Sequence, residues 1–505
     1  MKILAHLKGY FTLKILSPYL IFTYFYLRIC RKELGFNVLE ITLTYVSIIL
    51  LILGFILTIN YTFKKNHLLN SFVISILLFI LLFFEEIYNT IKIIAPFLND
   101  KIIICSIIVG AFIFIIVAIT KNLKSIKFNF FLNTLFIVFC SGELYKNYKI
   151  QVEVASTKPQ PLNLKTEKKA NQPNIYILII DGYTSNKSLK KYWNFDNKKF
   201  STFLTGNGFK VYDNSKSNYY YTIETMASMF NYDYIDKTKW NRYNLIKNDA
   251  IENRFISIFK QNGYLINNLS LIDFENEKKI LPISFFAFKK DKNIVKVFLS
   301  KIIKSNKNFI NILKTNSNKI KLQNDFYFRR KKEELILKKI DSISNNKTKK
   351  KLVISHNLLL HPPYDQSELN LARFAIDSFL LNSEKPNFLK KTKLNNLLKS
   401  YYLNEIISLN LVYTKVITSL LKKDKNTIII ILGDHGFRFL PSTNRKESNE
   451  ERYTNFMAIL IPKYSVLKFP ETLSPINAMR LITNETLGTK LELLVDKQIP
   501  SITNY

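Results

Sequence analysis

The stretch TIIIILGDHGFR, residues 427–438, carries a block of branched apolar side chains directly into an acid and a histidine. Continuous apolar runs, as opposed to alternating ones, are typical of strands that are buried on both faces of a mainly parallel sheet. Three similar runs alternate with helical patterns: IYILII at 175–180, LVIS at 352–355 and FMAILI at 456–461. We therefore expect residues 174–505 to form an α/β domain with a mainly parallel central sheet, whose ligands bind beyond the carboxyl ends of the strands.

Two of these apolar runs end in a carboxylate. Asp181 follows the run at 175–180, and Asp434 follows the run that begins at Thr427, with His435 directly after it. A carboxylate oxygen and an imidazole nitrogen at one point are ligands that suit Mn²⁺ and Zn²⁺. We expect a divalent metal ion there, although an Asp beside a Gly at a strand end is also ordinary turn chemistry, an alternative that stays open for Asp181.

Three of the five histidines, His356, His361 and His435, fall beside predicted strand ends. In the segment HNLLLHPPY, residues 356–364, the prolines favour an extended turn that presents His361 to a cleft. A histidine in that position can bind a phosphate oxygen or protonate a leaving group. For His356 and His361 the alternative is a loop histidine held by structural hydrogen bonds.

The segment SNYYYTIETMASMFNYDY, residues 217–234, has a strand-like aromatic entry followed by a short helical pattern that begins at Thr222. Met226, Met229 and Phe230 share the inner face of that predicted helix. The Thr222 hydroxyl can act as a simple N-cap. Alternatively, a metal can deprotonate this hydroxyl so that it attacks a phosphorus, while the helix N-terminus holds the anionic oxygens.

The N-terminal part of the chain is strongly apolar. We predict five transmembrane helices within residues 1–142, because five apolar runs there are each near the ~20 residues that cross a bilayer. The runs are 10–29, 36–62, 69–95, 101–119 and 128–142. With the N-terminus inside, the inner segments carry seven basic residues and the outer loops five, which favours that orientation. The region after residue 142 is then expected on the extracytoplasmic (periplasmic) side of the plasma membrane, where nucleic acid is not an expected partner.

Two polar stretches interrupt the pattern. Residues 143–173 contain three prolines and predict an extended linker along the membrane surface. The second stretch, about 300–350, contains the run RRKKEELILKK. It is either a helical insertion that touches anionic lipid or a solvated charged face.

Composition limits the possible classes of protein. The chain has 505 residues, 48% of them hydrophobic, and three cysteines, which excludes a disordered protein, collagen and a disulfide scaffold. The cysteines all precede residue 141, so the later part has no cysteine nucleophile or thiolate ligand. Of the net charge of +35, residues 1–150 (15 basic, 6 acidic) carry +9, leaving +26 for the rest. This excess favours anionic partners such as phospholipid head groups or phosphorylated glycans, or reflects a sequence-wide preference for Lys, Asn and Ile.

Taken together, the motifs resemble a known family. LIIDGYTS, SNYYYTIETMASMFNYDY, HNLLLHPPY, GDHGFR, NFMAILIP and SPINAMRLITN occur in the order and approximate spacing of membrane-anchored members of the alkaline phosphatase and sulfatase superfamily. Relatives with this layout are lipoteichoic acid synthase and the phosphoethanolamine transferases, which are similar in having five membrane helices before an external catalytic domain. The resemblance therefore implies an alkaline-phosphatase-like fold for residues 174–505.

The resemblance also implies roles for single residues. Asp181, Asp434 and His435 would be metal ligands, and Thr222 would be both a metal ligand and the catalytic nucleophile. His361 would act on the transferred group, with Arg438 and His356 as further substrate contacts. Because no histidine follows His435, the resemblance implies one metal ion, Mn²⁺ or Zn²⁺.

Departures from the family pattern narrow the expected activity. A Thr at 222 and no cysteine after residue 140 argue against a formylglycine sulfatase, and the missing disulfides and downstream histidine leave the donor open. We expect a phosphotransferase that moves a phospholipid head group, of phosphoethanolamine or phosphoglycerol type, to an envelope glycan or lipid. The alternatives are a hydrolase of phosphate or sulfate esters and a non-catalytic protein that binds envelope glycan or lipid.

Overall fold

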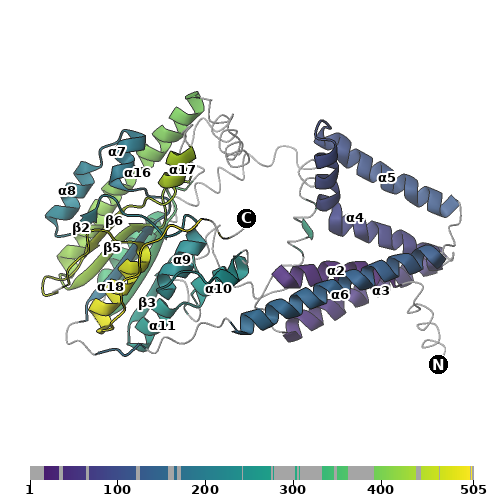
Figure 1. Ribbon diagram of the computed structural model, residues 1–505, viewed down its shortest axis with the longest axis horizontal. Helices are drawn as coiled ribbons and strands as arrows, with labels where there is room; N and C mark the ends of the chain where they lie inside the picture. The colour runs from purple at the N-terminus through teal and green to yellow at the C-terminus, as the bar shows by residue number, and fades with distance from the viewer. Residues whose placement is uncertain are drawn as a thin grey trace. The chain divides into compact units, whose positions relative to one another are not determined.

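The structure is a computed structural model, and the chain divides into two compact units. The structure describes residues 16–32, 38–63, 67–120, 126–156, 164–167, 172–240, 243–274, 277, 299, 302–303, 306, 333–345, 350–361, 392–438, 445–465, 467–500 and 502. One unit comprises Met1–Pro159 and Asp291–Asn318. The other comprises Gln160–Lys290 and Lys319–Tyr505. Figure 1 shows the described elements of both units.

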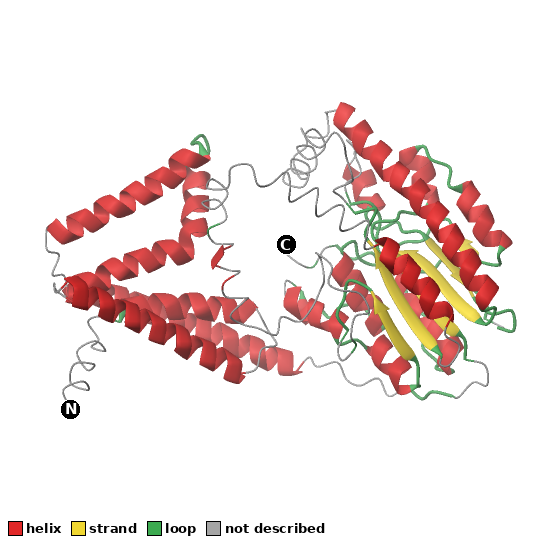
Figure 2. Cartoon of the chain, turned by 180° about the vertical axis from the view of Figure 1, so that it is seen from behind, coloured by secondary structure: helices red, strands yellow, loops and turns green. Residues whose placement is uncertain are grey.

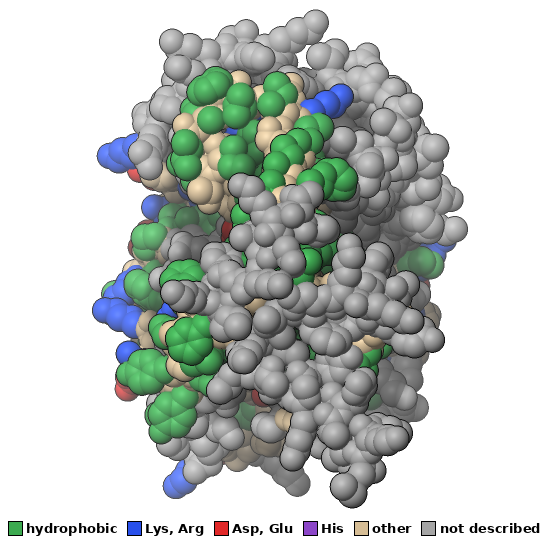
Figure 3. Space-filling model, turned by 90° about the vertical axis from the view of Figure 1, so that its right-hand side faces the viewer, with side chains coloured by type: hydrophobic (Ala, Val, Ile, Leu, Met, Phe, Trp, Pro, Cys, Tyr) green, Lys and Arg blue, Asp and Glu red, His purple; other side chains and the backbone are tan. Residues whose placement is uncertain are grey.

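The first unit is helical, and its described helices lie where the sequence has its apolar runs. They are α2 (Ser17–Lys32), α3 (Val38–Phe63), α4 (His67–Ile94), α5 (Asp100–Thr120) and α6 (Ile126–Ser156). Two of them are long and apolar enough to cross a membrane, over Leu69–Ile94 and Asp100–Val117. The side of the molecule drawn in Figure 3 shows gathered hydrophobic side chains. Phe112 and Val109 of α5 are exposed.

Polar contacts join the helices of this unit. The Arg28 guanidinium of α2 pairs with Glu86 of α4 at 3.2 Å, and Asn147 of α6 donates to the carbonyl of Leu27 at 3.1 Å. Asn306, from the segment Asp291–Asn318, donates to the carbonyl of Leu81 at 2.9 Å. In sequence, the segment Asp291–Asn318 interrupts the other unit. Its residue Asn306 nevertheless packs on α4 of the helical unit.

The expected extended linker begins later than residue 143. Helix α6 continues to Ser156, so residues 143–156 are helical, which corrects that part of the prediction. The reason is local: residues 143–156 contain neither Pro nor Gly, and Glu143 and Asn147 are held against the bundle, Glu143 at 3% exposure.

The second unit contains a six-stranded sheet of order β2-β6-β5-β1-β4-β3. The strands are β1 (Asn174–Ile180), β2 (Lys210–Tyr212), β3 (Leu265–Leu269), β4 (Lys351–Asn357), β5 (Thr427–Gly433) and β6 (Met457–Leu460). β1 pairs in parallel with both β4 and β5, and β3 pairs in parallel with β4. β6 pairs antiparallel with β5 and with β2. The expected α/β domain with a mainly parallel sheet is thus confirmed.

Helices cover both faces of the sheet, as Figure 2 shows. Along β1 the side chains alternate: Ile177 and Ile179 enter one core and Leu178 enters the other. The first core is completed by α9 (Thr222–Asn231), α10 (Tyr243–Ile251), α11 (Arg254–Gln261) and α18 (Pro475–Leu487). The second is completed by α7 (Asn186–Trp193), α8 (Lys198–Gly206) and α16 (Thr392–Lys423).

Two further segments were given a structure from the sequence: the residues before Thr222 and the stretch at about 300–350. The expected strand-like entry before Thr222 is wrong: residues 217–221 form no strand, and the isolated bridge of Lys216 to Thr454 lies just before them. Within the 300–350 stretch, residues 333–345 are helical and place Ile336 and Ile340 in the core. That part of the stretch is therefore a core helix.

Candidate metal centre and nucleophile

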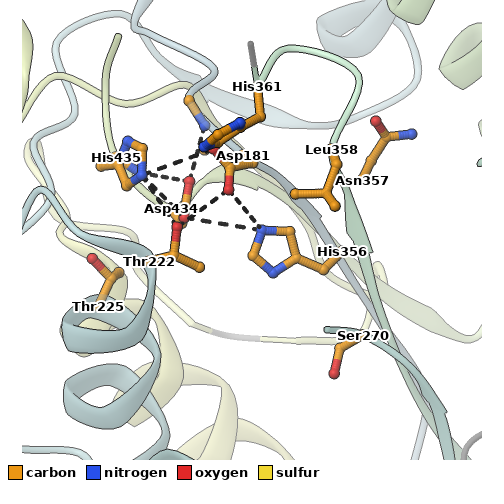
Figure 4. A network of polar contacts seen from close by, with 12 residues as sticks. Asp181, Thr222, Thr225, Ser270, His356, Asn357, Leu358, His361, Asp434 and His435 are labelled. Carbon is orange, nitrogen blue, oxygen red and sulfur yellow. Dashed lines mark hydrogen bonds and ion pairs between the residues drawn. The ribbon is translucent and has the colours of Figure 1, made fainter. Parts of the chain in front are cut away.

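The candidate site lies at the carboxyl ends of three adjacent strands. Asp181 follows β1, Asp434 follows β5, and His356 lies near the end of β4. Because β1 runs parallel to both neighbours, these three ends meet. Figure 4 shows the three side chains, with His435 and Thr222, directed at one point.

Asp434 is fixed by the backbone through one carboxylate oxygen only. Its Oδ1 accepts hydrogen bonds from the backbone N–H groups of Gly182 and His435, both at 3.0 Å. Its Oδ2 is buried and accepts no hydrogen bond within the part of the chain that the structure describes. A buried carboxylate oxygen without a donor is costly, so this atom calls for a cation.

His435 presents a neutral nitrogen to the acids. Its Nδ1 lies 2.7 Å from the carbonyl oxygen of Gly436 and donates to it, which leaves the lone pair of Nε2 free to face Asp434 Oδ2 at 3.4 Å. The pKa of His435 is lowered from 6.5 to about 3, first by burial and then by the charge of Arg438, although Asp181 opposes the shift. A neutral imidazole is the form that binds a metal.

Thr222 lies beside both acid and imidazole. Its hydroxyl donates to Asp181 Oδ2 at 3.2 Å and lies 3.3 Å from His435 Nε2. The cap residue of α9 is Tyr221, and Thr222 is the first helical residue. The alternative that Thr222 is a simple N-cap is therefore wrong, and its hydroxyl faces the site instead.

These groups fit a divalent ion. Asp181, Asp434 and His435 are buried, and their ligand atoms all lie within 4.8 Å of one another. Two carboxylates and one imidazole suit Zn²⁺ or Mn²⁺, and the unsatisfied Asp434 Oδ2 is the atom that such an ion would neutralise. The Thr222 hydroxyl is placed to complete the set.

His356 is closer to this centre than the sequence indicated. It lies within β4, is fully buried, and its Nε2 is 3.8 Å from Asp181 Oδ2 and 3.9 Å from Asp434 Oδ2. The alternative of a loop histidine is wrong for this residue. Its ring faces the two acids from the side opposite to the loop that carries His435 (Figure 4).

His361 and Arg438 form a pair at the site. A guanidinium N–H of Arg438 donates to His361 Nε2 at 3.2 Å, so the imidazole proton of a neutral His361 is on Nδ1. The Arg438 guanidinium also lies over the Tyr221 ring, 4.9 Å from its centroid. Both side chains are half-buried.

The turn after Asp181 is held by Tyr402, a residue in a part of the chain that carries no recognisable motif. The Tyr402 hydroxyl of α16 donates to the carbonyl of Gly182 at 2.7 Å and accepts from the N–H of Thr184 at 3.2 Å. It thereby fixes the turn after Asp181, where Gly182 has a positive φ of 69°. Tyr402 has no local sequence signal, because its partners lie some 220 residues away.

A family model described as "Protein of unknown function (DUF229)" matches residues 379–495. No curated protein matches the chain.

Solved structures are similar to most of the chain at low identity. The C-terminal periplasmic domain of EcEptC from Escherichia coli, in complex with Zn, is 17% identical over 65% of this chain and 86% of that one, with a TM-score of 0.36. The integral membrane protein lipooligosaccharide phosphoethanolamine transferase A (EptA) from Neisseria meningitidis is 12% identical over 87% and 88%, with a TM-score of 0.36. The putative sulfatase yidJ from Bacteroides fragilis is 13% identical over 62% and 74%, with a TM-score of 0.36. Phosphoethanolamine transferases and sulfatases are the kinds of protein that the sequence motifs resemble.

Proposed function

We propose that this chain is a metal-dependent phosphotransferase in which Thr222 takes a phosphoryl-type group from a lipid donor and passes it to an acceptor. The observation that carries the proposal is the position of the Thr222 hydroxyl, 3.2 Å from Asp181 and 3.3 Å from His435. Catalytic nucleophiles of this kind are recognised by such contacts with a base and a metal site. A binding protein would have no need of a hydroxyl in this position.

The first step forms a bond from Thr222 Oγ to phosphorus and breaks the bond from phosphorus to the donor's glycerol oxygen. A bound divalent ion would supply positive charge that favours the Thr222 alkoxide and the phosphoryl oxygens. The hydroxyl proton leaves along the hydrogen bond to Asp181 Oδ2. The departing glycerol oxygen takes a proton from the imidazolium form of His361, which becomes neutral, while Arg438 turns from His361 Nε2 to the phosphoryl oxygens.

The second step returns the enzyme to its initial state. The acceptor hydroxyl attacks phosphorus, gives its proton to His361, and the bond to Thr222 breaks as Oγ regains its proton from Asp181. Arg438 is the side chain that would contact the non-bridging oxygens, since its fork of N–H groups matches a phosphoryl group. His356, facing both acids, would help to hold the carboxylates in place.

The helical unit supports a membrane-resident donor. We propose that the chain is a multi-pass protein of the plasma membrane, that its sheet-containing unit faces the extracytoplasmic side, and that the donor is a phospholipid such as phosphatidylethanolamine or phosphatidylglycerol. Supporting observations are the two spanning-length helices and the five helices at the apolar runs. The acceptor would be an envelope glycan or lipid.

The test uses the full-length protein in detergent with Mn²⁺ or Zn²⁺ and fluorescent phosphatidylethanolamine or phosphatidylglycerol. Wild type should release diacylglycerol, Thr222→Ala should lower the rate by about 10³-fold or more, and Thr222→Ser should retain part of it. Bound metal, measured by mass spectrometry, should persist in Thr222→Ala because Asp181, Asp434 and His435 remain. A Thr222→Ala protein with wild-type release would overturn the proposal. Release that is unaffected by any added acceptor would identify a hydrolase instead.

A further inference from the structure

Two arginines and three tyrosines are assembled next to the nucleophile. The Arg452 guanidinium lies over the Tyr220 ring, 5.5 Å from its centroid. The centroid of the Tyr220 ring is 4.8 Å from that of Tyr221 and 5.2 Å from that of Tyr453. Tyr221 immediately precedes Thr222 and carries Arg438 over its ring. All five side chains are half-buried, so they are held in place and still reach solvent.

The two guanidinium groups lie over two tyrosine rings that contact each other. Arg438 lies over Tyr221 and Arg452 lies over Tyr220, and the centroids of these two rings are 4.8 Å apart. The Nε of Arg452 also donates to the carbonyl of Arg438 at 3.4 Å. Two cations over adjacent rings repel each other unless an anion lies close to them.

Arg452 has no carboxylate partner in the part of the chain that the structure describes. Among the described residues, its side chain makes one hydrogen bond, to the carbonyl of Arg438, and no ion pair between described residues includes it. The nearby acid Glu224 is fully buried and accepts from the N–H of Ile502 at 3.2 Å. By contrast, the guanidinium of Arg480 donates hydrogen bonds to the carbonyls of Tyr232 and Glu492. Arg480 is a structural arginine, whereas most of the Arg452 fork remains available.

The available fork defines the ligand chemistry. A planar guanidinium binds a phosphate or carboxylate through two parallel N–H groups. Arg438 is already engaged with His361 and is assigned to the transferred group, so Arg452 is left for a second anion. A lipid donor of the proposed type has a single phosphate, and that phosphate occupies the metal centre.

We propose that Arg452, Tyr220 and Tyr453 form a subsite for an anionic group, a phosphate or a carboxylate, that the acceptor carries in addition to its attacking hydroxyl. The inference rests on the proposed function and names the acceptor class: an anionic glycan or lipid. The tyrosine rings would pack on the acceptor skeleton while Arg452 binds its charge. The subsite would place the acceptor hydroxyl next to Thr222.

The first test compares acceptors in the full-length enzyme. Glucose, glucose 6-phosphate and glucuronate are offered with the fluorescent donor, and kcat/KM for each acceptor is measured. Wild type should prefer an anionic sugar over glucose by about tenfold or more, and Arg452→Gln should abolish that preference. The phosphate and carboxylate arms show which anion the subsite takes.

A matched control is available at Lys210, an exposed cation that lies over the Tyr212 ring at 5.8 Å on the edge strand β2. Lys210→Gln removes one positive charge from over a tyrosine without touching the site, so it should keep the wild-type acceptor preference. An Arg452→Gln enzyme with the same preference as Lys210→Gln would overturn the subsite.

A binding measurement separates failure of the subsite from failure of the proposed function. In the metal-loaded full-length Thr222→Ala protein, glucose 6-phosphate binding is measured by calorimetry with and without Arg452→Gln. Weakening of about tenfold by Arg452→Gln, absent with Lys210→Gln, supports the subsite even if no transfer occurs. Equal affinity in the Arg452→Gln and Lys210→Gln backgrounds would exclude it even if Thr222 chemistry is demonstrated.

Discussion

The turn that carries His435 has no room for a side chain at position 436. A Cβ on Gly436 would lie 1.8 Å from the carbonyl oxygen of Glu451 and 2.4 Å from that of Thr454, and both are backbone atoms. We predict that Gly436→Ala lowers the free energy of unfolding by at least about 2 kcal/mol, because the turn and its neighbour must separate. Bound metal should fall as well, since His435 moves with the turn. Denaturant unfolding and metal analysis measure both effects.

Gly206 provides the control for that substitution. It is the last residue of α8, and nothing lies within 4 Å of a Cβ placed on it. Gly206→Ala should therefore change the stability by less than about 1 kcal/mol and leave metal binding intact. If the two alanine variants unfolded alike and bound metal alike, the packing argument at Gly436 would fail.

At the residue scale, the candidate metal ligands at the strand ends could be predicted from the sequence, whereas the side chains that surround and support them could not. Asp181, Asp434 and His435 follow apolar runs, so their convergence could be read from the sequence, and the structure brings them together with Thr222. His356 was placed past its strand, because the buried polar residues of β4 shorten the apolar run. Arg452 and Tyr402 reach the site from distant segments without a motif, and only folding reveals them.

At the scale of elements, helix α17 (Arg445–Glu451) is tied to α7 through the fully buried Glu451. Its carboxylate accepts hydrogen bonds from Ser188, from Trp193 at 3.1 Å and from Thr454 at 3.0 Å. Burial raises the pKa of Glu451 from 4.5 to about 7, although these donors oppose the rise. Since the backbone of Glu451 packs on Gly436, this junction supports the turn that carries His435.

The raised pKa predicts a pH-dependent stability. Below pH 4.5 Glu451 is protonated in both folded and unfolded chains, whereas between pH 4.5 and 7 only the folded chain retains the proton. The contribution of protonated Glu451 to the free energy of unfolding is therefore fully present below pH 4.5 and is lost as the pH rises through 7. It amounts to at most about 3 kcal/mol.

The measurement is the difference in unfolding free energy between wild type and Glu451→Gln from pH 4 to 8. Wild type should lose stability relative to the variant as the pH rises. Taking the difference removes the opposite contribution of His435, whose lowered pKa is common to both proteins. A difference that is flat across this range would show that Glu451 does not titrate in this way.

Element prediction succeeded where apolar runs are continuous and failed where they are short or interrupted. β3 has the sequence LINNL, and its Asn267 and Asn268 are buried, with Asn268 donating to the carbonyl of Ile272 at 2.8 Å. A strand that buries amides does not show the apolar run on which the prediction relied. β2 has only three residues at the sheet edge, too few for a periodic signal.

At the scale of the whole molecule, the chain leaves the sheet-containing unit and returns to it. Asp291–Asn318 groups with the helical unit, although β3 precedes it and β4 follows it. Ile302 in this segment packs against the cluster that contains Phe83. No sequence pattern predicted this exchange, since the segment is polar and its partner helix lies more than 200 residues earlier. Removal of the first 159 residues would take away the surface on which Asn306 and Ile302 pack, so assays require the full chain.

Under the proposed function, the spanning-length helices predict that the protein acts on lipid in its own bilayer. With α4 and α5 embedded, the sheet-containing unit would be confined to one membrane surface, where a lipid donor is concentrated in two dimensions. In proteoliposomes containing the full-length protein, fluorescent donor in the same vesicles should be converted to diacylglycerol. Donor supplied in separate vesicles should be converted at least about tenfold more slowly.

Detergent distinguishes confinement from a loss of substrate. Once both vesicle populations are dissolved, donor from either source should be consumed at the same rate, because the enzyme and the lipid then mix freely. Equal consumption before detergent would mean that the site reaches across solution to another membrane, and the helices would then serve retention only. A water-soluble head-group ester, which needs no shared bilayer, should be turned over equally in both arrangements, so its rate confirms that the embedded enzyme is active throughout.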